Sequence, residues 1–271
     1  MEFVFEFGET AQSHAYLERF PNLPQAFERL VSLSNKVFGR PANFKSRMED
    51  VVFSLGHTCR EDLLEVVFLA VNGYDSGAMK LVRGLYERAL TVCYIAKNPD
   101  QAERFGRFAG IQEKKLLDAA LKIVTEEVFD KQMGEENTAA KIRERYEAVK
   151  PEFQVTVCKT CKRKSTSISW GIDIPSMVQK VGAPFDQVFL TGYAIPNLSV
   201  HATLASALNR TADEPESMSH DDEVAIFTAI VVFFSLLRVQ NSVFELGLEE
   251  EISACENELI PVLIGAENQQ A

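Results

Sequence analysis

Apolar residues recur every three to four positions along most of the chain, which is the spacing of amphipathic helices. The alternation of apolar and polar residues that marks strands is nearly absent. Proline, glycine and capping residues divide the periodic pattern into successive segments. The helices expected from these signals cover residues 24–38, 46–72, 76–97, 101–125, 137–150, 174–181, 221–246 and 249–263. The sequence therefore predicts an all-α protein, a multi-helix bundle of antiparallel helices.

The expected domain organisation is a single all-α domain over residues 1–271. An N-terminal arm occupies 1–20, and a polar tail occupies 264–271. Residues 127–172 differ in character from the rest, because they combine a charged helix with two cysteines, several basic residues and the only tryptophan. We interpret them as an insertion in the bundle.

Composition narrows the class of protein. The chain has 271 residues, of which 46% are hydrophobic, and its net charge is −11. Such a surface repels nucleic acid and anionic membranes unless a local basic patch overrides it. The longest apolar runs are too short to cross a membrane. Five cysteines at irregular spacing, without a basic leader sequence, favour reduced thiols and a cytoplasmic location.

Several charged residues fall where the helical pattern calls for apolar ones. Arg83 lies inside an apolar arc of its helix, with Glu87 one turn further on. Glu65 interrupts the apolar run of the preceding helix, and two helices joined by a short turn normally pack antiparallel. We therefore expect Glu65 to be buried and to meet Arg83, because a buried carboxylate needs a partner. Arg238 is a further charge in an apolar helix.

The stretch YAIPNLSVHATLA supplies the remaining candidates, which are Tyr193, Ser199 and His201. Two interpretations stay open. In the structural one, a buried network of arginine, glutamate and histidine specifies helix register. In the functional one, Arg83 holds an anion while His201 or a glutamate transfers a proton.

The same residues resemble a family, the domain-of-unknown-function family 5677. The stretches that carry the resemblance are LVRGLYE (81–87), SWGIDIPSMVQKVG (169–182) and YAIPNLSVHAT (193–203), within a match over about 50–240. The family is distantly similar to HEPN-type helical bundles, many of which are dimeric ribonucleases or toxin-like defence proteins. That group carries a histidine four to six residues after an arginine, and this spacing does not occur here.

A second candidate site is the pair Cys158 and Cys161, which forms a CxxC motif. A structural zinc site needs four ligands, so the others would come from Cys59, His57, His220, Cys255 or a second subunit. Zinc binding, a redox role and no role at all stay open. Around this pair, residues 141–164 hold eight basic residues against three glutamates, a patch that can contact phosphates or simply face solvent.

Two functions follow as hypotheses, and the sequence leaves open whether the protein is an enzyme. Phosphate-binding loops, nucleophile elbows and zinc-protease motifs are absent. The first hypothesis is an HEPN-like RNA-acting or toxin/defence-type effector, acting as a homodimer, with the catalytic set Glu65, Arg83, Glu87, Tyr193, Ser199 and His201. The alternative is a non-enzymatic helical module that binds a protein partner or a small ligand, with the polar cluster structural. The partners expected are RNA or a small anionic ligand. No cofactor is expected other than the zinc considered above, and no membrane partner is expected.

Overall fold

The computed structural model describes residues 10–156, 160–161, 164–167, 169–200 and 221–265. These residues form two compact units, which we call unit 1 (residues 1–97 and 174–271) and unit 2 (residues 98–173). Over these described ranges the fold is helical apart from one two-stranded sheet, so the all-α prediction is confirmed. None of the described helices is long and apolar enough to span a bilayer.

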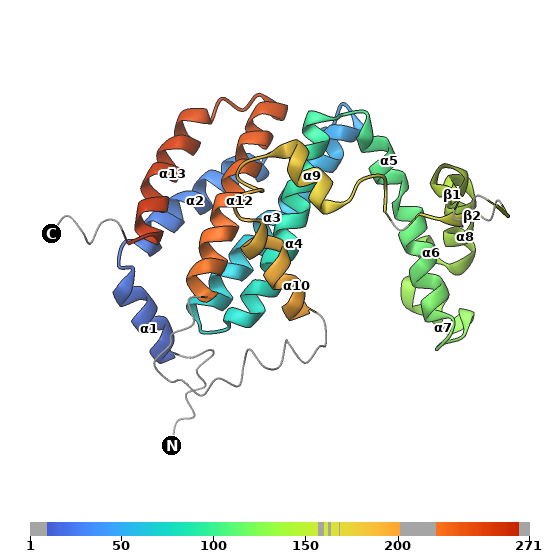
Figure 1. Cartoon of the computed structure of the whole chain (residues 1–271), viewed down its shortest axis with the longest axis horizontal. Helices are drawn as coiled ribbons and strands as arrows, with labels where there is room; N and C mark the ends of the chain where they lie inside the picture. The colour runs from blue at the N-terminus through green and yellow to red at the C-terminus, as the bar shows by residue number, and fades with distance from the viewer. Residues whose placement is uncertain (1–9, 157–159, 162–163, 168, 201–220, 266–271) are drawn as a thin grey trace, which may run out of the picture. The chain divides into compact units, whose positions relative to one another are not determined.

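Unit 1 is a bundle built around three long helices that lie side by side in Figure 1: α3, α4 and α12. Shorter helices cover this centre, with α2 against α13 and with α9 and α10 against α4. The helices of unit 1 are α1 (Thr10–Arg19), α2 (Leu23–Phe38), α3 (Arg47–Val71), α4 (Asp75–Lys97), α9 (Ile174–Val181), α10 (Ile195–Val200), α12 (Asp221–Phe244) and α13 (Glu249–Leu263). A π-helical turn, η3 (Leu190–Ala194), precedes α10.

The ends of α3 show why the sequence forms a helix there. Ser46 is its N-cap, and its hydroxyl accepts a hydrogen bond from the Glu49 amide at 3.2 Å. The carboxylates of Glu49 and Asp50 in the first turn interact favourably with the positive N-terminal end of the helix dipole. At the other end the chain reverses at Gly73, whose φ is +78°, a backbone conformation that favours glycine. The reversal places α4 antiparallel to α3.

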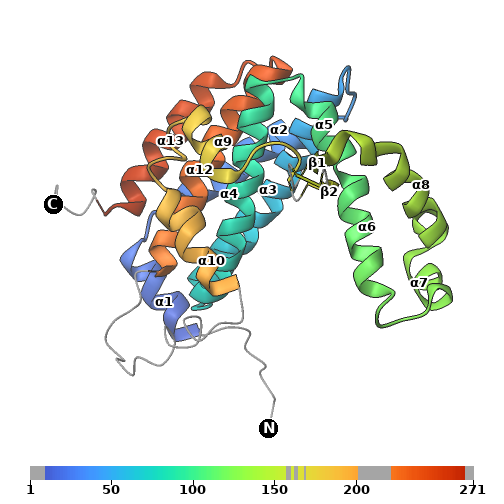
Figure 2. The same cartoon turned by 45° about the vertical axis from the view of Figure 1, so that its right-hand side comes forward.

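Unit 2 contains a helical hairpin in which α6 and α8 lie side by side and α7 lies at one end (Figure 2). Its elements are α5 (Gln101–Arg107), α6 (Ala109–Ala120), α7 (Glu126–Met133), η1 (Glu135–Asn137), α8 (Ala139–Val149), η2 (Lys150–Phe153), β1 (Gln154–Thr156) and β2 (Lys164–Thr166). The two strands pair antiparallel, with Val155 opposite Ser165. A small core of Leu117, Phe129, Ala139 and Ile142 holds the hairpin together.

The insertion expected over 127–172 lies within unit 2, which also takes in α5 and α6. The expected helix over 101–125 is divided at Phe108 into α5 and α6. Residues 10–19 of the expected N-terminal arm form the helix α1, Phe20 follows it and is buried, and residues 1–9 lie outside the described residues. Most of the expected tail also lies outside them.

Candidate functional site

Arg83 and Glu87 form the ion pair that their spacing on α4 predicts. Arg83 Nε donates a hydrogen bond of 3.0 Å to Glu87 Oε1. The two side chains keep 23% and 35% of their surface exposed, so the pair lies at the edge of the bundle rather than in its core. One nitrogen of the guanidinium is engaged in this bond, and both groups are in reach of a ligand that arrives from solvent.

Tyr193 covers this pair from the π-helical turn η3. The Arg83 guanidinium carbon lies 5.6 Å from the centre of the Tyr193 ring, within range of a cation–π interaction. The backbone of η3 also approaches α4 closely at Gly192, because a Cβ added at this residue would lie 2.4 Å from the ring of Tyr86. The Tyr86 hydroxyl donates to the carbonyl oxygen of Phe185 at 2.7 Å, and burial raises the pKa of Tyr86. The side chain of Tyr86 is therefore held in place by burial and by this hydrogen bond, and η3 packs against its ring.

The two remaining candidates of this stretch cannot be placed beside Arg83. Ser199 belongs to α10, which packs on α4, but its side chain is outside the described part of the structure. His201 also lies outside the described residues. Their role in the site therefore stays a prediction.

The expectation that Glu65 is buried and meets Arg83 is wrong. Glu65 is exposed, on the outward stripe of α3 that also carries Glu61 and Phe68. Arg238 joins neither residue, because it pairs with Glu256 and Glu249 of α13. The structure thus brings together Arg83, Glu87 and Tyr193, and it leaves Glu65 and Arg238 apart from them.

The buried carboxylate of α3 is Asp62, which the sequence analysis missed. Asp62 Oδ2 accepts a hydrogen bond of 2.6 Å from Arg88 Nη1, and only 10% of its side chain is exposed. Burial raises the pKa of Asp62 to about 6, although the Arg88 charge opposes the shift. The signal was available, because Asp62 shares the inward face of α3 with Cys59 and Val66, whereas Glu65 does not.

The cysteines give no metal centre among the described residues. Cys161 is exposed, and Cys158 lies outside the described residues. Cys59, Cys93 and Cys255 are buried, and burial raises the pKa of all three thiols. Within the described ranges, no three potential ligands are close enough to hold an ion. Zinc binding at the CxxC pair stays an untested prediction.

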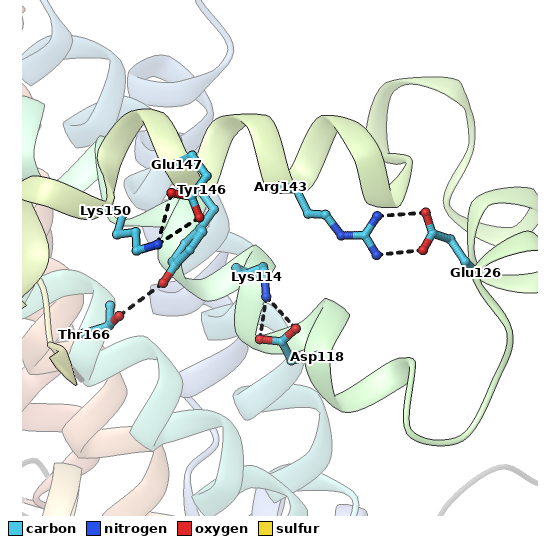
Figure 3. Close-up of polar contacts among 8 residues, drawn as sticks. All are labelled: Lys114, Asp118, Glu126, Arg143, Tyr146, Glu147, Lys150 and Thr166. Atoms are coloured by element: carbon cyan, nitrogen blue, oxygen red, sulfur yellow. Dashed lines mark hydrogen bonds and ion pairs between the residues drawn. The ribbon is translucent and has the colours of Figure 1, made fainter.

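The basic residues of α8, and Lys150 directly after it in η2, are neutralised within unit 2, as Figure 3 shows for part of the set. Arg143 forms two hydrogen bonds with Glu126, at 2.8 and 2.6 Å, and Lys150 pairs with Glu147. The Lys114 ammonium pairs with Asp118 and lies 5.4 Å from the ring centre of Tyr146. Lys141 and Arg145 likewise have glutamate partners. On this helix the pattern is that of a solvated, charge-balanced face.

The model of a family of unknown function, DUF5677, matches residues 49–218, which is more than half of the chain. This range takes in both α4 and the η3–α10 stretch. No curated protein and no solved structure matches.

Proposed function

Because the chain belongs to the family of unknown function DUF5677, we propose its function from the site itself: an HEPN-like, RNA-acting effector in which Arg83, Glu87 and Tyr193 form the phosphate-binding part of the active site. One observation carries this proposal, the partly exposed Arg83–Glu87 pair covered by Tyr193. His201, which the sequence places eight residues after Tyr193, is the proposed acid/base.

The exposure of the pair supports a ligand-binding role over a structural one. An ion pair open to water contributes about 0–1 kcal/mol to stability, because solvent screens it. A buried pair whose partner is removed would cost roughly 3–5 kcal/mol. Arg83 and Glu87 keep 23% and 35% of their side-chain surface exposed, so solvent partly screens the pair and its removal should cost less than that of a buried pair. Within the described residues, Nε of Arg83 is the guanidinium nitrogen that has a hydrogen-bond partner, and a guanidinium is the group best suited to hold a phosphate in a fixed orientation.

The π-helical turn supports the same proposal. π-helical turns are rare, and they occur frequently at functional sites because the extra residue re-aims side chains. Here the turn directs Tyr193 onto Arg83, and Gly192 lets the backbone approach Tyr86. An aromatic ring beside a guanidinium gives a base or a ribose a surface to pack on.

The proposed reaction is transesterification of RNA. The ribose 2′-oxygen forms a bond to the adjacent phosphorus while the bond from phosphorus to the 5′-oxygen breaks. One proton leaves the 2′-hydroxyl and one reaches the 5′-oxygen, and the products are a 2′,3′-cyclic phosphate and a 5′-hydroxyl. In this scheme Arg83 holds the non-bridging oxygens, and His201 transfers a proton.

The test is cleavage of a labelled RNA by the full chain, with the cyclic phosphate as the diagnostic product. His201→Ala and Arg83→Ala are expected to lower the rate by roughly 100-fold or more, the usual weight of an acid/base or a charge-stabilising group. Arg29→Ala, which removes the ion pair to Glu258 elsewhere in unit 1, serves as the matched control and should keep full activity. Absence of cleavage by the wild type, or full cleavage by His201→Ala, would refute the proposal.

A second candidate function is a non-enzymatic module that binds a small anionic ligand at the same pair. The observation in its favour is the charge balance of α8, whose cations already have carboxylate partners and offer no track for a long RNA. Titration calorimetry with inorganic phosphate distinguishes the two candidates. The module predicts phosphate binding that Arg83→Ala removes, together with intact RNA. The homodimer and the cytoplasmic location expected from the sequence stay predictions.

A further inference from the structure

Unit 1 contains a cavity that is separate from the Arg83–Glu87 pair. It has a volume of about 500 Å³ and lies where α1, η3, α12 and α13 approach one another. This volume falls in the range of small-molecule sites, roughly 300–1,000 Å³. Its walls are mainly apolar, from Phe20, Val188, Val224, Phe227, Leu263 and Ile264. Such walls suit a hydrocarbon chain or ring.

Two threonine hydroxyls line the cavity between η3 and α12. Thr228 Oγ1 donates to Thr191 Oγ1 at 3.0 Å, and Thr191 Oγ1 donates to the carbonyl oxygen of Val188 at 3.3 Å. Each hydroxyl has a single hydrogen, and both hydrogens are used inside the protein. What the two hydroxyls offer to the cavity is therefore oxygen lone pairs. A ligand that meets them must bring a hydrogen-bond donor.

The charges around the cavity determine whether a positively or a negatively charged ligand is favoured. The first turn of α12 carries Asp221, Asp222 and Glu223, and Glu223 is paired with Arg19 on the cavity wall. The C-terminal end of α13, where Leu263 and Ile264 line the cavity, has no basic residue in its last turn. A helix C-terminus is the negative end of its dipole. The positive N-terminal end of α12 and this negative end of α13 act in opposite directions, so the side chains decide the sign. Among the described residues named here, three carboxylates outnumber one guanidinium, which favours a cation over an anion.

We propose that this cavity binds an amphipathic amine, with its apolar body against the α12 and α13 walls and its protonated nitrogen donating to Thr191, Thr228 and the carboxylate of Glu223. The volume, the accepting hydroxyl pair and the negative surroundings are independent observations that agree on this class of ligand. The inference does not depend on the proposed function, because it uses none of Arg83, Glu87 or His201.

The experiment is calorimetric titration of the full chain with octylamine, below its aggregation concentration, and with octanoate as the probe of opposite charge. Octylamine is expected to bind at least roughly tenfold more tightly than octanoate, as expected when a charge-assisted hydrogen bond is replaced by repulsion. Thr228→Val keeps the shape but removes the hydroxyl, and it should weaken octylamine binding by roughly tenfold. Val224→Phe fills the cavity and should abolish binding.

Two controls keep the result specific. Ser32→Ala changes an exposed hydroxyl in the groove between α2 and α13, and it should leave octylamine binding unchanged. Arg83→Ala should also bind octylamine normally, so that failure of this proposal and failure of the proposed function can be told apart. The circular dichroism of each variant must match the wild type. Should Thr228→Val fail to fold, Thr191→Val tests the same hydroxyl pair. Equal binding of octanoate, no binding of octylamine, or binding that survives Val224→Phe would overturn the proposal.

Discussion

Replacing Asp62 with asparagine tests whether burial, rather than the attraction of Arg88, sets the charge of this carboxyl group. Asp62 is the most enclosed carboxylate of α3, and its partner Arg88 keeps 36% of its side chain exposed. The guanidinium is therefore hydrated and screened, and it offsets only part of the cost of burying the carboxylate. The pKa of Asp62 rises to about 6 as a result.

The sign of the pH effect follows from this shift. An aspartate in an unfolded chain has a pKa of about 3.9, so between pH 4 and 6 the folded protein binds one more proton than the unfolded chain. The free energy of unfolding therefore falls as the pH rises, by about 1.4 kcal/mol per pH unit within that window. The extra stability is fully present below about pH 4 and is lost above about pH 6. An integrated difference of about 2–3 kcal/mol between pH 4 and 7 follows.

Asparagine cannot titrate, so Asp62→Asn should lack this component. Both proteins are unfolded in urea at several pH values, and unfolding is monitored by hydrogen exchange of the α3 and α4 peptides. This readout gives the difference in the free energy of unfolding of unit 1 between the two proteins. We expect the free energy of unfolding of the wild type, minus that of the variant, to decrease by about 2–3 kcal/mol from pH 4 to pH 7. Asp50→Asn, which breaks an exposed pair with Arg47 on the same helix, is the control and should give parallel curves. Parallel curves for Asp62→Asn, or a difference that increases with pH, would show that Arg88 dominates and that the reasoning is wrong.

Three further substitutions probe the packing. Gly192→Ala would place a Cβ 2.4 Å from the Tyr86 ring, and we expect thermal unfolding to show a loss of about 1–3 kcal/mol. Gly56→Ala would place a Cβ 2.3 Å from Gln240 Nε2, and a similar loss is expected, which truncating Gln240 to alanine should partly restore in a double-mutant cycle. Phe129→Ala removes the largest side chain of the small core in unit 2. It should destabilise unit 2 by about 3–5 kcal/mol, measured by the fluorescence of the single tryptophan, while hydrogen exchange in α3 and α4 stays unchanged.

The sequence predicted the long helices well because their signals are local. The expected segment 46–72 became Arg47–Val71, and the expected 174–181 matches α9. Capping residues and glycines mark such ends whatever the rest of the chain does. The helix α7 (Glu126–Met133) and the two-unit organisation were not predicted. The sequence of α7, EEVFDKQM, is largely charged and polar, so it shows little apolar periodicity. Unit boundaries depend on contacts between segments far apart in the chain.

The candidate site was predictable only as far as it is local. Arg83 and Glu87 lie four residues apart on one helix, so their pairing needs no knowledge of the fold. Asp62 and Arg88 meet across two helices, and the choice between Asp62 and Glu65 depends on which face of α3 turns inward. The other residues of the helix decide it, because Cys59, Asp62 and Val66 share one buried arc of α3 and Glu65 lies outside that arc and is exposed. One charged residue in an apolar run, such as Glu65, does not by itself show which face of the helix turns inward.

The π-helical turn η3 contributes a residue to each of the two candidate sites of unit 1, the Arg83–Glu87 pair and the cavity at Thr191 and Thr228. The sequence did not predict this connection. Thr191 and Tyr193 are two residues apart in the turn, and residues at that spacing point to nearly opposite sides of a helix. Thr191 therefore reaches α12 at the cavity, while Tyr193 reaches Arg83 on α4. Gly192, between them, has no room for a side chain against Tyr86. A methyl group at this position must displace the turn, so Gly192→Ala should weaken octylamine binding and RNA cleavage together. Gly56→Ala, with a comparable loss of stability but a different place in the bundle, should weaken neither, and this contrast separates a displaced η3 from general destabilisation.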